Sequence, residues 1–298
     1  MNKKLNFVFW GTPDVASETL EILKENGYIP SLVITAPDRP QGRKMLITPL
    51  PVKVWAIENN IPYIQPEILS GKDLLLAGVS QADEPRGSAV PAGTDSDPIK
   101  VESLPDLFLV VAYGKIIPEE IINMPKLGSI NIHYSLLPKH RGASPVESAI
   151  LNGDTETGIT IQKMEYKMDS GAGIAQQKVE ISPDEKAGDL RKRLIKIGGE
   201  LLVKTLPDFI DGKIKLTPQN ENGVTFCKKI KKEDGLIDLN DDPIKNYNKF
   251  RAYAVWPRTF FFKDGKRIII TDAKLENGQF IIKKIIPEGG KEIIYKNQ

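Results

Sequence analysis

A run of six apolar residues, 107–112, most constrains what this chain can fold into. A segment without polar alternation is typical of a central parallel strand that is covered on both faces. Another strand-like run at 5–10 leads into a helix-like stretch that ends near Asn26, and a further run follows at 31–36. Strand, helix and strand at this spacing predict a right-handed βαβ unit.

The helices have readable ends. Thr12 is the predicted N-cap of the first helix, Pro13 occupies its first position and Gly27 stops it. Residues 51–59 predict a second helix, and 186–211 predict a long amphipathic helix. Helices that alternate with apolar strands favour an α/β fold.

The residue pattern changes after Gly212, where short runs of residues that favour β-strands alternate with turns. Residues 263–266 contain Asp-Gly and 276–279 contain Asn-Gly, and both pairs are strong hairpin signals. We therefore predict a Rossmann-like, mostly parallel sheet with helices on both faces over 1–205. A linker at 206–212 and a small β-rich, OB-like barrel domain over 213–298 complete the predicted organisation.

Composition narrows the class of protein. Hydrophobic residues make up 40% of the chain and charged residues 27%, as in ordinary globular proteins. No apolar run approaches the length of about 18 residues that a membrane span needs. Cys227 is the single cysteine, so neither an intrachain disulfide nor a Cys-His zinc cluster can form. We expect a cytoplasmic protein without a metal, and a surface loop over 79–100, where small and polar residues dominate.

The net charge of +2 conceals an asymmetry. Residues 213–298 hold 18 basic and 11 acidic residues, a net of +7, whereas 1–212 hold 23 basic and 28 acidic residues, a net of −5. A basic C-terminal part beside an acidic body favours binding of a polyanion. A solvated lysine-rich surface is the alternative.

The strand predicted over 129–133 carries the most informative polar residues. Asn131 and His133 are two positions apart, so their side chains share one face of a strand. Ligands in an open α/β sheet bind just beyond the carboxyl ends of the strands. We expect Asn131 and His133 at such an end, although a histidine bonded to a neighbouring loop would explain His133 alone.

The motifs around Asn131 and His133 favour a functional role for these residues over a structural one. The sequence resembles the folate-dependent formyltransferases at 131–138, 141–145, 153–160 and 168–171. It is similar in particular to the members that act on methionyl-tRNA at 11–14, 37–43, 51–54, 110–114, 117–118, 232–238, 251–253 and 256–257. Tyr134 departs from the family pattern, which has a smaller residue or proline there.

The resemblance implies a catalytic triad of Asn131, His133 and Asp169. It also implies transfer of the formyl group of 10-formyltetrahydrofolate to the α-amine of methionine on initiator tRNA. Asn131 would stabilise the tetrahedral oxyanion. His133 would donate to the same oxygen or pass a proton to the departing folate nitrogen, and Asp169 would orient His133 and favour its protonated form.

Two further sets of residues follow from the resemblance. The expected tRNA contacts lie on a basic loop and are Arg39, Arg43 and Lys44, with the C-terminal domain as a second tRNA-binding part. We expect a monomer that does not bind membranes. The expected folate site comprises Val110, Val111, Ala112, Tyr113, Gly114, Ser135, Leu136, Leu137 and Pro138.

Several alternatives stay open at this point. A formyltransferase acting on a sugar-nucleotide or another small amine, or a formyltetrahydrofolate hydrolase, would share the triad. A nucleotide-dependent oxidoreductase is disfavoured because Gly11 lacks a Gly-x-Gly-x-x-Gly context. A non-catalytic RNA-binding protein would have no need of Asn131, His133 and Asp169 together.

Overall fold

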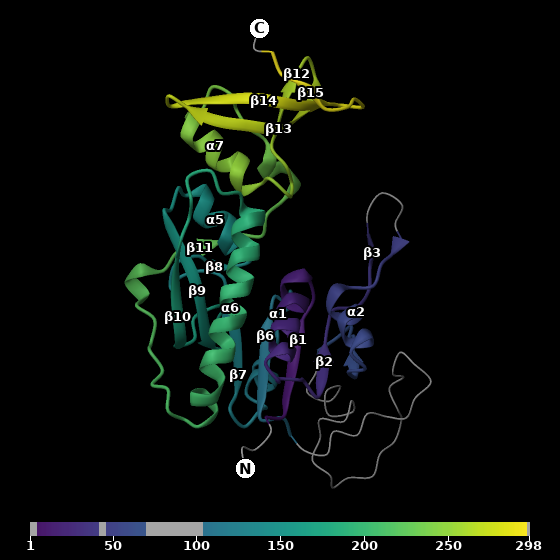
Figure 1. Cartoon of the computed structure of the whole chain (residues 1–298), viewed down its shortest axis with the longest axis vertical. Coiled ribbons are helices and arrows are strands. Elements are labelled where there is room, and N and C mark those ends of the chain that lie inside the picture. Colours follow the sequence, from purple (N-terminus) through teal and green to yellow (C-terminus); the bar gives the residue numbers. More distant parts are fainter. Residues whose placement is uncertain (1–4, 42–45, 70–103, 297–298) are drawn as a thin grey trace. The chain divides into compact units, whose positions relative to one another are not determined.

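The computed structural model describes residues 5–41, 46–69 and 104–296 (Figure 1). The chain divides into two compact units that interleave along the sequence. The first comprises Met1–His133, Thr160–Ala175 and Ile195–Gln219, and the second comprises Tyr134–Ile159, Gln176–Leu194 and Asn220–Gln298. The boundaries expected from the sequence at 205 and 213 stay a prediction, and the segment 79–100 lies outside the described residues.

A seven-stranded sheet has the order β10-β9-β7-β6-β1-β2-β5. Strand β1 pairs in parallel with β2 and β6, β2 with β5, and β6 with β7, whereas β9 runs antiparallel to β7. The predicted mostly parallel sheet with helices, followed by a β-rich part, is confirmed. The predicted OB-like barrel is not seen among the described residues, where the C-terminal strands form a four-stranded sheet whose two edge strands do not pair. The strands are β1 (Phe7–Gly11), β2 (Leu32–Ile34), β5 (Tyr63–Ile64), β6 (Leu107–Val111), β7 (Ser129–His133), β9 (Glu156–Lys163) and β10 (Gly173–Glu180).

The apolar runs predicted at 5–10 and 107–112 correspond to β1 and β6, which lie side by side within this sheet. Both strands have a neighbouring strand on either side, and every residue of β1 and β6 is buried. Helix α1 packs against β6 and α2 packs against β2. The helices are α1 (Asp14–Glu25), α2 (Pro51–Glu58), α4 (Glu119–Ile122), α5 (Pro145–Leu151), α6 (Ala187–Ile210) and α7 (Pro243–Ala252). Short strands and 3-10 turns are β3 (Pro40–Gln41), β4 (Leu46–Ile47), β8 (Arg141–Gly142), β11 (Phe226–Cys227), η2 (Glu221–Gly223) and η3 (Lys232–Gly235).

The expected cap of the first helix was wrong. Pro13, not Thr12, is the N-cap residue of α1, and it makes no side-chain capping hydrogen bond. The Thr12 hydroxyl instead donates to the Tyr113 carbonyl at 2.9 Å and accepts from the Ala36 N–H at 3.4 Å. It therefore ties together the loops that follow β1, β2 and β6, which are neighbours in the sheet.

The C-terminal part contains a four-stranded antiparallel sheet with the order β12-β13-β14-β15. Both Asp264 and Gly265, and both Asn277 and Gly278, have positive φ, as the predicted two-residue hairpin turns require. Helix α7 packs on β13 and β14 through Tyr247 and Phe250. The strands are β12 (Phe260–Lys263), β13 (Lys266–Glu276), β14 (Gln279–Pro287) and β15 (Ile293–Ile294).

None of the helices within the described ranges has the length and apolar character needed to cross a membrane.

Candidate active site

Asn131 and His133 lie on β7, where the neighbouring strand determines their surroundings. The antiparallel register places Asn131 opposite Gln162 and His133 opposite Thr160 of β9. His133 is buried, with 5% of its surface exposed, and Asn131 is half-buried. Because residues directly opposite in adjacent strands are close neighbours, the polar residues gather on one part of the sheet surface.

Asp169 joins this group from outside the sheet. Its Oδ1 lies 3.6 Å from His133 Nδ1, and the same oxygen accepts a 3.0 Å hydrogen bond from Gln162 Nε2. The side chain of Asp169 is 14% exposed. The structure therefore brings together the three residues expected from the sequence, with Gln162 as a link between them.

A tight turn positions Asp169. Residues 164–172 leave β9 and return to it, closing with a 2.9 Å hydrogen bond from the Lys163 N–H to the Ala172 carbonyl. Asp169 has φ of 51°, in the left-handed region that aspartate tolerates better than most residues. A Cβ on Gly171 would lie 1.7 Å from the Lys163 carbonyl oxygen, so only glycine fits there.

Gly171→Ala is expected to destabilise the fold by about 2 kcal/mol and to displace Asp169, since the added methyl group overlaps backbone that cannot swing aside. Urea unfolding of the purified variant measures this. Gly212→Ala is the control for a glycine in the same unit with nothing within 4 Å of an added Cβ, although its φ of 68° adds some strain. Equal stability of Gly171→Ala and the unmodified protein would contradict the assigned role of this glycine.

Two glutamines of this site were not expected from the sequence. Gln162 contacts the Asp169 carboxylate, and Gln219 Nε2 donates to the carbonyls of Asp169 at 2.8 Å and Gly171 at 2.7 Å. Gln162 alternates with Thr160 on one strand face, which is a readable signal. Gln219 carries no such signal, because it follows α6 and reaches the turn only through the tertiary fold.

The first expected folate segment, 110–114, ends β6 and turns away from it. Ala112 and Gly114 have positive φ and are exposed, whereas Tyr113 between them is buried. The Tyr113 ring meets Trp10 edge-on at 5.2 Å, and burial raises the pKa of Tyr113 to about 12. The packing of Tyr113 on Trp10 therefore holds the exposed residues Ala112 and Gly114 in place.

The second expected folate segment, 135–138, belongs to the other unit. The Ser135 hydroxyl donates to the Lys139 carbonyl at 2.6 Å, and Gln176 Nε2 donates to the Leu137 carbonyl at 3.0 Å. Leu137 is buried, Leu136 and Pro138 are half-buried, and the Leu137–Pro138 peptide is cis. These bonds hold the segment in one conformation.

The expected tRNA loop is described only in part. Arg39 is exposed and pairs with Glu67 at 2.5 Å. Next to it, Asp38 pairs with Lys53 at 2.6 Å; burial alone would raise the pKa of Asp38, but Lys53 and Gln65 together hold it below its ordinary value. Arg43 and Lys44 lie outside the described residues.

A second histidine–carboxylate pair lies in the other unit. His140 Nε2 is 2.7 Å from Asp154 Oδ2, and the His140 N–H donates to Thr225. Arg141 next to it is fully buried and pairs with Glu221 at 2.7 Å. In the described part of the chain, no group of three or more His, Cys, Asp or Glu side chains is placed to hold a metal ion.

The chain matches two family models. One is described as formyl transferase and covers residues 3–206, and the other, formyl transferase C-terminal domain, covers 229–297. The chain is 37% identical over 271 residues to methionyl-tRNA formyltransferase of Sulfurihydrogenibium sp., covering 91% of this chain and 80% of that protein. It is 38% identical to the Staphylococcus aureus protein of the same name, covering 90% of this chain and 79% of that protein.

Solved structures share the fold. A Helicobacter canadensis N-formyltransferase, in complex with folinic acid and dTDP-3-aminofucose, has a TM-score of 0.65 at 18% identity, covering 98% of this chain and 100% of that one. Methionyl-tRNA formyltransferase from Clostridium thermocellum has a TM-score of 0.59 at 16% identity, with the same coverage. At these identities the likeness concerns the fold alone.

Proposed function

Since the chain belongs to the formyl transferase family, we propose that it transfers the formyl group of 10-formyltetrahydrofolate to the α-amine of methionine on initiator tRNA. Relatives named for formyl transfer to methionyl-tRNA are 37–38% identical over about nine-tenths of the chain. The observation that carries the catalytic part is the convergence of Asn131, His133 and Asp169, with 3.6 Å between the last two.

The reaction forms one C–N bond and breaks another. The neutral methionine amine attacks the formyl carbon and the carbonyl oxygen becomes an oxyanion. The bond from that carbon to N10 of the folate then breaks, and the proton lost by the amine goes to N10. The protein has to stabilise the oxyanion and to move that proton.

Asn131 and His133 are suited to these two tasks. The Asn131 amide donates to the developing oxyanion, and one preorganised donor of this kind supplies about 3–4 kcal/mol. His133 turns Nδ1 toward Asp169, and in this proposal the same ring carries the proton to the folate nitrogen through Nε2. The Asp169 carboxylate, held by Gln162, stabilises the imidazolium that forms when His133 carries the proton.

The two folate segments supply different contacts. The exposed backbone at Ala112 and Gly114 offers N–H and C=O groups to the polar edge of a pterin ring. The half-buried Leu136 and Pro138 supply a largely apolar surface, and the buried Ser135 and Leu137 hold them in position. In the first segment the buried Val110, Val111 and Tyr113 position the exposed Ala112 and Gly114.

The tRNA is bound electrostatically in this proposal. Arg39, Arg43 and Lys44 contact the acceptor end, and the basic C-terminal domain over 213–298, with its net charge of +7, contacts the body of the tRNA. The enzyme works as a monomer in the cytoplasm, where charged initiator tRNA is found.

A formyltransferase that acts on a sugar nucleotide is the second candidate, because such enzymes share the fold at TM-scores up to 0.65. The discriminating experiment incubates the purified protein with 10-formyltetrahydrofolate and one of three acceptors. Charged initiator tRNA should be formylated, whereas charged elongator methionyl-tRNA and dTDP-amino sugars should not. Formylation of the amino sugar alone would replace the proposal by the second candidate.

Arg39→Ala is expected to raise the KM for charged tRNA about fivefold, the effect of losing roughly one phosphate contact, and to leave the KM for the folate unchanged. Initial rates with each substrate varied in turn measure both constants. The control is Glu67→Gln, which removes the negative charge of the partner of Arg39 but keeps the guanidinium. A fivefold rise in the folate KM of Arg39→Ala would contradict the assignment of this loop to tRNA.

A further inference from the structure

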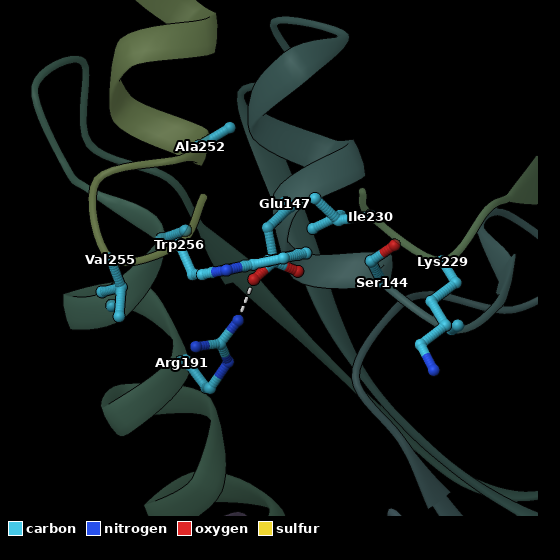
Figure 2. A pocket seen from close by; sticks show the side chains of 11 residues that line it. Ser144, Glu147, Arg191, Lys229, Ile230, Ala252, Val255 and Trp256 are labelled. Atoms are coloured by element: carbon cyan, nitrogen blue, oxygen red, sulfur yellow. Dashed lines mark hydrogen bonds and ion pairs between the residues drawn. The ribbon is translucent and has the colours of Figure 1, made fainter. Parts of the chain in front are cut away.

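A cavity of about 290 Å³ lies wholly within the second unit (Figure 2). Its lining comes from α5 and the two residues before it, the first two turns of α6, the segment of Lys229 and Ile230, and the end of α7 with the loop that follows it. None of these lining residues belongs to the site proposed above for formyl transfer. The volume is near the lower end of the range of about 300–1,000 Å³ for small-ligand sites, which suits a single nucleobase.

Trp256 is the aromatic residue of this cavity. It is 54% exposed, whereas Trp10 and Trp55 are 0% and 6% exposed. Val255 beside it is also exposed, and Ala252 and Ile230 add apolar surface to the lining (Figure 2). A half-exposed indole over an apolar cavity is a stacking surface for a planar ring, and base–aromatic stacking contributes about 1–3 kcal/mol per base.

A charged pair gives the cavity a polar side. Arg191 donates to Glu147 Oε1, and the two side chains lie together at the lining in Figure 2. The Glu147 side chain is only 9% exposed, and burial lowers the pKa of Arg191. The carboxylate and the guanidinium together carry no net charge, so the pair does not by itself draw a phosphate into the cavity, whereas the Glu147 carboxylate can accept hydrogen bonds from the amino and imino groups of a base edge.

Positive charge lies on the segment that forms one side of the cavity. Lys228, Lys229, Lys231 and Lys232 are all exposed. Lys229 and Ile230 themselves line the cavity. Four lysines in five residues attract a phosphate backbone, while the ring and the carboxylate lie within the cavity.

We propose that this cavity binds one unpaired nucleotide of an RNA strand, with its base stacked on Trp256 and its amino edge toward Glu147. The flanking phosphates lie beside Lys229 and its neighbours. The inference rests on the proposed function in that tRNA supplies such a strand, and it adds a base-binding site to the electrostatic contacts already described. Paired bases cannot enter because their faces and edges are already occupied.

The direct test is fluorescence anisotropy of labelled RNA with the full chain. Single-stranded hexaadenylate should bind more tightly than a six-base-pair duplex at equal salt. Trp256→Ala should weaken binding of the single strand by about 5- to 160-fold, the loss expected for one stacked base, and Trp256→Phe should restore most of the affinity. Phe262→Ala is the matched control, since Phe262 is 58% exposed and does not line the cavity.

Intrinsic fluorescence gives a second readout, because Trp256 is the exposed tryptophan and a stacked base quenches it. Equal affinities of Trp256→Ala and Phe262→Ala, or duplex binding as tight as single-strand binding, would overturn the base site. Formyl transfer is measured in the same preparations. If the protein formylates initiator tRNA but Trp256→Ala binds RNA normally, only the base-binding site is refuted. If RNA binding depends on Trp256 but no formyl group is transferred, only the proposed function is refuted.

Discussion

Asp169→Asn is expected to leave the protein folded and to reduce the rate of formyl transfer by about 10²- to 10⁴-fold, the usual contribution of a positioned acid–base group. The amide keeps the size of the carboxylate but removes the negative charge 3.6 Å from His133 Nδ1. The imidazolium formed during proton transfer then loses its stabilising partner. Single-turnover rates with charged initiator tRNA measure the loss, and the affinity for the folate should stay unchanged.

The chain offers a matched control for this variant. Asp154→Asn removes the carboxylate that faces the other histidine, His140, at 2.7 Å in the second unit. Its single-turnover rate per folded molecule should equal that of the unmodified protein, even where thermal unfolding shifts. If Asp169→Asn turned over at a near-normal rate, or if both variants lost the same activity, the role of Asp169 in catalysis would be refuted.

Asn131→Ala is expected to lower kcat by about 10²- to 10³-fold with little change in either KM, because an oxyanion donor acts mainly in the transition state. Asn131 is half-buried on β7, opposite Gln162, so the truncation removes the amide without opening a large cavity. Steady-state kinetics with each substrate varied separate kcat from KM. Complete loss of formyl transfer by Asn131→Ala, with unchanged affinity for the folate, would also support the role of Asn131 as an oxyanion donor.

Asn123→Ala is the control for an asparagine of the same unit outside the site, at the exposed C-terminal end of α4. It should leave kcat unchanged. A rise in the KM of Asn131→Ala with normal kcat would instead show that Asn131 binds substrate equally in the ground and transition states, and the oxyanion assignment would fail.

Local pattern was enough for the regular elements. Residues 107–111 of the apolar run form the buried strand β6, with Ala112 exposed just after it, and the Asp-Gly and Asn-Gly pairs form hairpin turns with positive φ. Such features depend on neighbouring residues alone, through burial on both faces or through backbone sterics. Thr12 shows the limit, since its hydroxyl bonds to Tyr113, which is 101 residues away, rather than to the adjacent helix.

Contacts between residues that meet only through long-range packing could not be predicted from the sequence. Gln219 reaches the Asp169 turn across 50 residues, and Glu147, Arg191 and Trp256 line one cavity from three separate elements. No periodicity connects them, because their proximity depends on how strands and helices pack and not on the spacing within any one of them.

The sequence by itself determined that Asn131 and His133 share a strand face, since alternation in a β-strand leaves residues two apart on the same side. It also determined the mostly parallel sheet through its apolar runs. Only the tertiary structure decided that Asp169 comes within 3.6 Å of His133, because this depends on the antiparallel register of β7 and β9 and on the tight turn at Gly171. Strand faces follow from covalent geometry, whereas the meeting of distant side chains follows from packing of the whole fold.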